Sequence, residues 1–292
     1  MKITLRPDLK SMSTLRLGGT ADAAYHVQDY NDLEVLGKKW PELGPRVLVM
    51  GRGSNILFQE NLKDLSIVLW GKKDDPVILN ESGEKIKVMV DAGMSMPGLL
   101  RWCSARGLTG LENLAGIPGR VGGAVVMNAG SYGAETADAL NRLTVWTPDS
   151  GIMEIDSAGF QAGYRSLDFT DIAGPFIIIK AGFILGKDDP ARVKSRIRSY
   201  YNQKKNTQPV LEKTAGCVFK NPPDSHPAGF LLEKAGFRGK GRGGVIFSDK
   251  HSNFLVNKDR GSSQAALELI SEAREKILEM FGISLEMEVE VV

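Results

Sequence analysis

The sequence predicts a globular protein in which helices and strands alternate, arranged as about two domains. Short apolar runs bounded by turn residues alternate along the chain with segments of helical periodicity. The chain has 292 residues, and a compact domain holds roughly 150. Its composition, 42% hydrophobic and 25% charged, is that of a chain able to bury a core.

Five short apolar runs predict strands, because each is bounded by residues that favour turns. They lie at residues 47–50, 66–70, 86–90, 176–180 and 245–247. The end of the chain, residues 285–292, alternates strictly between apolar side chains and Glu286, Glu288 and Glu290. A period of two predicts a strand with one apolar face.

Three segments have the pattern of helices. In residues 95–107, Pro97 suits a first turn and Gly107 suits a helix end. Residues 263–281 carry an apolar stripe with helical spacing, and Gly282 follows the last apolar residue. A third helix opens at residues 187–190 and connects two parts of the chain.

The third helix is rich in basic side chains: Lys194, Arg196, Arg198, Lys204 and Lys205. Such a row can form a nucleic-acid surface or the solvated face of a helix. The formal net charge is only +2, from 37 basic and 35 acidic residues. We therefore interpret the row as a solvated face and expect no nucleic-acid binding.

Cysteine, histidine and hydropathy patterns indicate a reducing compartment. The two cysteines, Cys103 and Cys217, cannot form a disulfide framework, and the three histidines have no metal-ligand spacing. Residues 1–10 carry charges where a signal peptide needs an apolar run, and no run approaches the roughly 18 apolar residues of a membrane span. We expect a cytoplasmic protein with no membrane insertion and no metal.

A first glycine-rich segment follows the predicted strand at residues 47–50. Residues 51–55 read GRGSN, and main-chain N–H groups in such a turn can bind phosphate oxygens. The segment lacks the third glycine of a dinucleotide-binding fingerprint and the Gly-Lys-Ser/Thr of a P-loop. From these residues alone, an ordinary tight turn remains the alternative.

A second glycine-rich segment is longer. Residues 110–130 contain six glycines, with small residues between them. A main chain without bulky side chains can lie flat against a ligand. Ordinary loops would need several unusual turns in succession, so we interpret this segment as a ligand contact.

Together with residues 13–19 (STLRLGG), the two glycine-rich segments resemble the flavin-binding half of the UDP-N-acetylenolpyruvoylglucosamine reductase family. The resemblance continues through GYRS at 163–166, AGCVFKNP at 215–222, AGFLLE at 228–233, KHSNF at 250–254 and LEMEV at 285–289. These blocks follow the family's order and span essentially the whole chain. The connection between Arg165 and Cys217 is short, as in the family's second type.

The resemblance implies an α+β fold. An FAD-binding portion of the vanillyl-alcohol-oxidase-like (PCMH) type would precede a carboxy-terminal α+β substrate domain. The implied boundaries are residues 1–72 and 73–200 for two FAD-binding subdomains and 201–292 for the substrate domain. The implied activity is reduction of UDP-N-acetylglucosamine enolpyruvate to UDP-N-acetylmuramate with non-covalent FAD and NADPH, by a chain that we expect to be a monomer.

The resemblance also assigns residues. The implied catalytic residues are Arg165, which would stabilise charge on the substrate carboxylate, Cys217, the proton donor, and Glu288. Asn221 and His251 would bind the substrate. The implied cofactor-binding residues are Gly51, Arg52, Gly53, Ser54, Asn55, Ile56, Gly116, Ile117, Pro118, Gly119, Gly122, Gly123, Ala124 and Asn128.

Several positions leave alternatives open. Glu286, Glu288 and Glu290 could together be a solvated strand face, and Cys217 could be a buried core thiol, as we expect for Cys103. Three residues depart from the family pattern: Cys217 replaces a common Ser, Glu290 a common Arg, and Arg120 a small hydroxyl residue. A flavin oxidase of different specificity and a non-catalytic binding module are the competing functions. The carboxy-terminal blocks disfavour the first, and the joint presence of the three catalytic residues disfavours the second.

Overall fold

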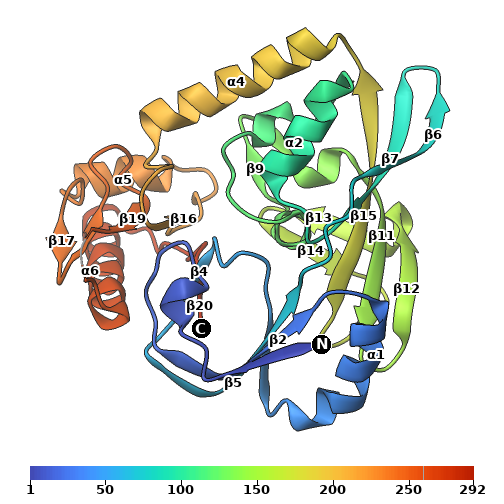
Figure 1. Ribbon diagram of the computed structural model, residues 1–292. Helices are drawn as coiled ribbons and strands as arrows, with labels where there is room; N and C mark the ends of the chain where they lie inside the picture. Colours follow the sequence, from blue (N-terminus) through green and yellow to red (C-terminus); the bar gives the residue numbers. More distant parts are fainter. Residues whose placement is uncertain (259) are drawn as a thin grey trace. The chain divides into compact units, whose positions relative to one another are not determined.

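The computed structural model describes residues 1–258 and 260–292 (Figure 1). The chain forms two compact units. Unit 1 contains Met1–Leu5, Ala23–Arg52 and Asp64–Asn202, and unit 2 contains Arg6–Asp22, Gly53–Lys63 and Gln203–Val292. The division of the chain at residues 72 and 200 into three parts remains a prediction.

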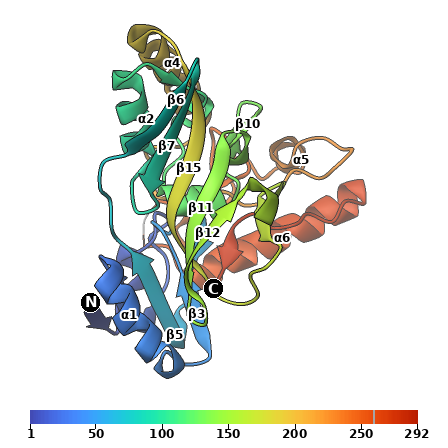
Figure 2. The ribbon, with the colours of Figure 1, turned by 90° about the vertical axis from the view of Figure 1, so that its right-hand side faces the viewer.

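Unit 1 contains two sheets. The first has the strand order β1-β2-β5-β3. The second has the order β12-β11-β15-β7-β6, which can be followed in Figure 2, and β8 pairs with β15. The strands of the first sheet are β1 (Lys2–Leu5), β2 (Thr20–Val27), β5 (Asn61–Trp70) and β3 (Arg46–Val49). Those of the second are β6 (Val77–Ser82), β7 (Lys85–Asp91), β8 (Leu108–Thr109), β11 (Leu140–Thr147), β12 (Gly151–Asp156) and β15 (Ile177–Lys187).

Unit 1 also contains two short hairpins, four α-helices and four short 3-10 helices. The hairpins are β9 (Gly130–Ser131) with β10 (Ala134–Glu135), and β13 (Phe160–Gly163) with β14 (Ser166–Phe169). The helices are α1 (Tyr30–Lys39), α2 (Met96–Ala105), α3 (Val121–Val126) and α4 (Pro190–Thr207), which continues into unit 2. Buried side chains of the second sheet and of α1, α2 and α3 form one hydrophobic core.

The start of α2 follows from its sequence. Ser95 has an extended backbone and its side chain accepts a hydrogen bond from Gly98 N at 3.2 Å, which caps the helix. Pro97 occupies the first turn, and Gly107 adopts a φ of +63° just after the helix. The predicted helix at residues 95–107 is therefore confirmed.

Unit 2 is built on a four-stranded sheet of order β16-β19-β18-β17. Figure 1 shows α6 beside this sheet, and buried residues from both share one core. The strands are β16 (Thr214–Cys217), β17 (Gly241–Arg242), β18 (Val245–Phe247) and β19 (Phe254–Asn257), and β4 (Ile56–Leu57) pairs in parallel with β20 (Glu290–Val291). The helices are α5 (Ala228–Lys234) and α6 (Ser263–Phe281).

Of the two elements predicted at the end of the chain, the helix is confirmed and the strand is not. Helix α6 has the predicted bounds, and Gly282 ends it with a φ of +69°. The single strand predicted over residues 285–292 is wrong, because only Glu290–Val291 form a strand and Met287 makes an isolated bridge with Phe219. Burial follows the alternation only in part: Leu285 and Val289 are buried and Glu286 and Glu290 are exposed, but the residues between and after them are all half-buried, namely Met287, Glu288 and Val291. In the part of the chain that the structure describes, we find no helix both long and apolar enough to cross a membrane.

Candidate active site

In unit 1, the first glycine-rich segment lies against the second. A Cβ atom at Gly51 would lie 3.6 Å from Cβ of Arg120 and 3.9 Å from Cα of Gly123. A Cβ at Gly123 would meet no described heavy atom within 4 Å, so this side of α3 is open. Gly116 and Gly119 have φ values of +81° and +143°, which favour glycine. A main chain so free of side chains fits close approach by the diphosphate of FAD.

Arg120 precedes α3, and its side chain contacts the protein itself. Its Nη1 donates a hydrogen bond of 2.6 Å to the main-chain oxygen of Trp70. Burial, and then the charge of Arg52, lowers the pKa of the Arg120 guanidinium. This departure from the family pattern therefore has a structural explanation, because the guanidinium is bound to a carbonyl group of unit 1.

The rest of the first glycine-rich segment belongs to unit 2. Gly53 has a φ of +64°, and its carbonyl oxygen accepts a hydrogen bond from Thr14 N at 3.1 Å. The Thr14 hydroxyl donates to the Thr214 carbonyl at 2.6 Å. Asn55 Nδ2 donates to the Glu288 carbonyl at 2.9 Å, and Glu290 N donates to the Asn55 carbonyl at 2.9 Å. This segment is thus fastened to the two segments that carry Cys217 and Glu288.

Main-chain hydrogen bonds bring Cys217 and Glu288 together within unit 2. Glu288 N donates to the Val218 carbonyl at 2.8 Å, and Lys220 N donates to the Glu286 carbonyl at 2.9 Å. Val218 and Val289 are buried in the core, whereas Cys217 and Glu288 are half-buried. The pairing therefore places both predicted catalytic residues, each half-buried, on neighbouring segments.

The two cysteines differ as predicted in their surroundings. Cys103 lies in the core of unit 1, where burial raises the pKa of its thiol to about 12. Cys217 is half-buried and follows Gly216, whose φ of +85° lies within an irregularity of the β16–β19 pairing. Gly216 thus turns the chain so that the Cys217 side chain is not packed into the core.

The three carboxy-terminal glutamates do not form one uniform solvated face. Glu286 and Glu290 are exposed, and Glu286 Oε1 forms an ion pair of 2.5 Å with Lys220 Nζ. Glu288 is half-buried. Although Glu290 is exposed, burial raises the pKa of its carboxyl, so burial does not distinguish Glu288 from Glu290, and the catalytic role of Glu288 stays a prediction.

Arg165 lies in unit 1, in the turn that joins β13 and β14. Its φ is +60°, an uncommon value for a residue with a side chain. Its guanidinium carbon stands 5.0 Å from the ring centroid of Tyr164. A Cβ at Gly130 would lie only 3.2 Å from Arg165 Nη1, so the guanidinium occupies space that glycine leaves free.

Asn128, predicted to bind the cofactor, is fully buried in unit 1. Its Nδ2 donates to Glu135 Oε2 at 2.7 Å and to the Gly163 carbonyl at 2.9 Å. Its Oδ1 accepts from Ala137 N at 3.0 Å. The side chain is therefore bound to the two hairpins of unit 1.

Asn221 and His251, the predicted substrate ligands, both lie at the amino-terminal end of α5. Asn221 Oδ1 accepts a hydrogen bond from Ala228 N at 3.0 Å. A Cβ at Gly229 would lie 3.2 Å from His251 Cε1, so glycine makes room for the ring. Burial, and then the charge of Arg238, lowers the pKa of His251. The two residues are thus close together, and both have structural contacts of their own.

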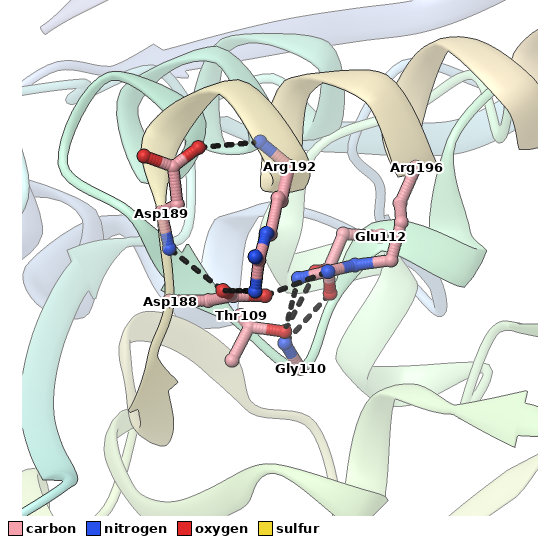
Figure 3. Close-up of polar contacts among 7 residues, drawn as sticks. All are labelled: Thr109, Gly110, Glu112, Asp188, Asp189, Arg192 and Arg196. Carbon is pink, nitrogen blue, oxygen red and sulfur yellow. Dashed lines mark hydrogen bonds and ion pairs between the residues drawn. The ribbon is translucent and has the colours of Figure 1, made fainter.

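An ion-pair cluster around the buried Glu112 in unit 1 was not predicted from the sequence (Figure 3). Arg196 on α4 donates to Glu112 Oε1 at 2.8 Å and to Asp188 Oδ2 at 2.7 Å, and Glu112 also accepts from the Thr109 hydroxyl and from Gly110 N. Burial alone would raise the pKa of Glu112, but these hydrogen bonds lower it below its usual range. The pairing of Glu112 with Arg196 depends on α4 meeting the Thr109–Gly110 segment, and sequence periodicity carries no signal for it.

The same cluster corrects our interpretation of α4 as having a solvated basic face. Arg196 has only 38% of its side chain exposed and is bound to two carboxylates. Lys204 is buried, with 4% of its surface exposed. The interpretation is wrong for these two residues, whereas the other three basic residues of the row are exposed as predicted: Lys194, Arg198 and Lys205.

Comparisons with known proteins match both parts of the chain. The model of the FAD binding domain matches residues 21–156, and that of the carboxy-terminal domain of UDP-N-acetylenolpyruvoylglucosamine reductase matches residues 208–292. The reductase of that name from Nitratidesulfovibrio vulgaris is 40% identical over 291 residues, covering 100% of this chain and 98% of the relative. The one from Oleidesulfovibrio alaskensis is 40% identical over 287 residues, covering 98% and 96%.

A solved structure agrees with these relatives. The crystal structure of UDP-N-acetylenolpyruvylglucosamine reductase from Thermus caldophilus superimposes with a TM-score of 0.81 at 29% identity, covering 99% of this chain and 98% of that one. The predicted fold class, an FAD-binding portion followed by a carboxy-terminal substrate domain, is confirmed. So is FAD as the cofactor. The chain belongs to the UDP-N-acetylenolpyruvoylglucosamine reductase family.

Proposed function

We propose that this chain is an FAD-dependent reductase that converts UDP-N-acetylglucosamine enolpyruvate to UDP-N-acetylmuramate, with NADPH, in the synthesis of peptidoglycan precursors. Membership of the family and full-length identity to reductases of this name support the proposal. The structural observation that carries it is the pairing of the Cys217–Lys220 segment with the Glu286–Val289 segment. That pairing puts a thiol and a carboxyl group on adjacent, half-buried positions.

The substrate defines what the chain's own residues must do. Reduction of an enolpyruvyl ether adds hydride to the methylene carbon and a proton to the adjacent carbon. FAD, once reduced by NADPH, supplies the hydride chemistry. The protein is left with three tasks, which are to bind the substrate, to stabilise the charge that develops on its carboxylate, and to supply the proton.

Arg165 and Glu288 take the second task in this proposal. Hydride addition moves negative charge onto the substrate carboxylate, and a guanidinium offers that carboxylate a planar fork of donors. Glu288 assists as a hydrogen-bond donor in its protonated form, because a second bare carboxylate would repel the first. Asn221 and His251, beside each other at α5, bind the polar remainder of the sugar nucleotide.

Cys217 takes the third task. A thiol has an ordinary pKa of about 8.5, so it is a much stronger acid than the serine hydroxyl common in the family. The half-buried position after Gly216 gives the thiol access that Cys103 lacks. We assign the single protonation step to the Cys217 thiol.

Substitution of Cys217 tests this assignment. General acid catalysis contributes about 10²–10⁴-fold, so Cys217→Ala should slow reoxidation of the flavin by the enolpyruvyl substrate by that range. Reduction of the flavin by NADPH should stay near the wild-type rate, and Cys217→Ser should keep more activity than Cys217→Ala. Stopped-flow absorbance of the flavin separates the two half-reactions.

Cys103→Ala is the matched control, because it removes the other thiol, which is buried in the core of unit 1. It should leave both half-reactions unchanged. If Cys217→Ala were reoxidised at the wild-type rate, another group would have to be the proton donor.

The proposal also includes a cytoplasmic location and a monomeric state. Light scattering of the holoenzyme measures the oligomeric state.

A further inference from the structure

Every hydrogen-bonding position of the Asn128 amide except one lone pair is used inside unit 1. Both Nδ2 protons are donated, one to Glu135 Oε2 at 2.7 Å and one to the Gly163 carbonyl at 2.9 Å. Oδ1 accepts from Ala137 N at 3.0 Å, and the residue is fully buried. The Asn128 side chain therefore has no donor left for a cofactor.

The Gly163 bond reaches the turn that carries Arg165. Gly163 ends β13, and Arg165 lies two residues further on, with a φ of +60°. Asn128 itself has a φ of +38°. The hydrogen bond from Asn128 to Gly163 thus connects two segments in which a non-glycine residue, Asn128 or Arg165, has a positive φ. Such backbone strain persists only where surrounding contacts impose it.

Glu135 approaches Arg165 from the other hairpin. Its carboxylate receives the charge-assisted bond from Asn128, and its main-chain N–H donates to Asp138 Oδ2 at 2.8 Å. A Cβ at Gly130 would lie 2.9 Å from Glu135 Cγ and 3.2 Å from Arg165 Nη1. The glutamate and the guanidinium therefore border the same bare face of Gly130.

We infer that Asn128 is a positioning residue for Arg165: with Glu135, it fixes the turn that presents the guanidinium to the carboxylate of the enolpyruvyl substrate. The inference rests on the proposed function and adds a residue to it. Asn128 reaches the turn of Arg165 through Gly163 and Glu135, so its effect belongs to the half-reaction in which Arg165 works.

Asn128→Asp tests the inference with almost no change of shape. A carboxylate oxygen would replace the amide nitrogen and face Glu135 Oε2 and the Gly163 carbonyl, both of which would repel it. Misplacement of a positioned group by about 1 Å can cost roughly 10²-fold. We expect reoxidation of the flavin by the substrate to slow by up to that factor, with FAD content and the rate of reduction by NADPH as in wild type.

A double-mutant cycle with Arg165→Lys separates positioning from a general loss of structure. If Asn128 acts through Arg165, Asn128→Asp should slow reoxidation by less than about twofold in the Arg165→Lys background. Full additivity of the two effects would overturn the inference. Loss of FAD from Asn128→Asp, with both half-reactions slowed equally, would also overturn it and would favour cofactor binding.

Thr136→Val is the matched control. The Thr136 hydroxyl is buried in the same loop and donates a bond of 2.8 Å to the Ala129 carbonyl, but this bond does not reach the β13–β14 hairpin. The control should keep wild-type rates in both half-reactions. Should Asn128→Asp fail to fold, Glu135→Gln replaces it, because it weakens the same bond from the acceptor side. We expect a several-fold slower reoxidation alone, and wild-type reoxidation would contradict us.

The wild-type enzyme distinguishes failure of this inference from failure of the proposed function. If its reduced flavin is not reoxidised by the enolpyruvyl sugar nucleotide, the proposed function and the inference fall together. If it is reoxidised, and Asn128→Asp is equally fast, only the role of Asn128 is lost.

Discussion

The two units anchor a buried polar residue beside a predicted site segment in different ways. In unit 1, Glu112 has 4% of its surface exposed and is held by the charge of Arg196, at 2.8 Å. In unit 2, Asn253 has 2% exposed and is held by the main chain of Phe219, accepting from its N–H at 3.0 Å and donating to its carbonyl at 2.8 Å. Glu112 shortly precedes the Gly116–Gly119 turn, and Phe219 shortly follows Cys217.

The difference shows which perturbation each anchor is sensitive to. A buried carboxylate depends on remaining charged and on keeping its cationic partner. The neutral Asn253 amide bonds to both main-chain groups of Phe219, so it depends on keeping both a donor and an acceptor. The stability of unit 1 should therefore fall when the charge of Glu112 is removed, and that of unit 2 when the Asn253 side chain can no longer donate as well as accept.

The largest effect on stability is expected in unit 2. Asn253→Asp keeps the acceptor for Phe219 N but places a buried carboxylate oxygen against the Phe219 carbonyl. The free energy of unfolding should fall by about 3 kcal/mol, because a buried donor is lost and a charge is introduced. Denaturant titration measures it, with Asn80→Asp on the exposed strand β6 as a control that should show no resolvable change. If the two variants lowered the free energy of unfolding equally, the buried Asn253 amide would contribute no more to stability than the exposed Asn80 amide.

A smaller loss is expected for Glu112→Gln in unit 1. The amide would place donors against Arg196 and Thr109 or Gly110, and the free energy of unfolding should fall by about 2 kcal/mol. Glu272 is the matched control, since it also accepts from an arginine and a second cation, but 37% of its side chain is exposed. Glu272→Gln should not measurably change stability, and a comparable loss there would contradict the distinction.

The smallest effect is a difference in the pH range over which a titratable group of each unit loses its contribution to stability: Glu112 in unit 1 and, in unit 2, His251, whose Nδ1 accepts a hydrogen bond from Asn253 N at 3.3 Å. Both His251 and Glu112 have a lowered pKa in the folded protein, so the unfolded chain binds more protons and stability falls as the pH falls. For His251 this loss begins below its ordinary pKa of 6.5, and for Glu112 only below 4.5.

Thermal unfolding between pH 7 and 5, a range of about two units around the ordinary histidine pKa, checks this assignment. His251→Gln should make the melting temperature depend less steeply on pH in this range. Some dependence should remain, because the pKa of His26 is also lowered. Glu112→Gln should leave this slope unchanged and flatten only the more acidic limb. If the dependence of stability on pH in this range were unchanged in His251→Gln, burial would not lower the pKa of the His251 ring in the folded protein.

Local patterns were sufficient where a segment's structure depends on its own residues. Helix α6 could be predicted over residues 263–281 because its apolar stripe and Gly282 define it locally. The segment after it could not, because its partners are short and come from elsewhere in unit 2: Glu288 pairs with Val218, and Glu290 with Asn55 and Ile56. Alternation there correctly predicted that Leu285 and Val289 are buried, but Met287 and Val291 are only half-buried, and the length of the strand was not predicted.

The candidate site divides in the same way. The glycine-rich segments and the blocks around Arg165, Cys217 and Glu288 could be identified by their resemblance to a family. The partners of Asn128 and Glu112 could not, since Gly163 and Arg196 become their neighbours only in the folded chain. A sequence motif therefore does not reveal that one of its residues positions another, because the contact forms only in the folded chain.

An anaerobic titration of the wild-type holoenzyme tests the central claim most directly. NADPH should bleach the flavin, and a stoichiometric amount of UDP-N-acetylglucosamine enolpyruvate should then restore the oxidised spectrum while UDP-N-acetylmuramate is formed. The account would be contradicted if the reduced flavin kept its bleached spectrum with the enolpyruvyl sugar nucleotide and returned to the oxidised form only when oxygen was admitted.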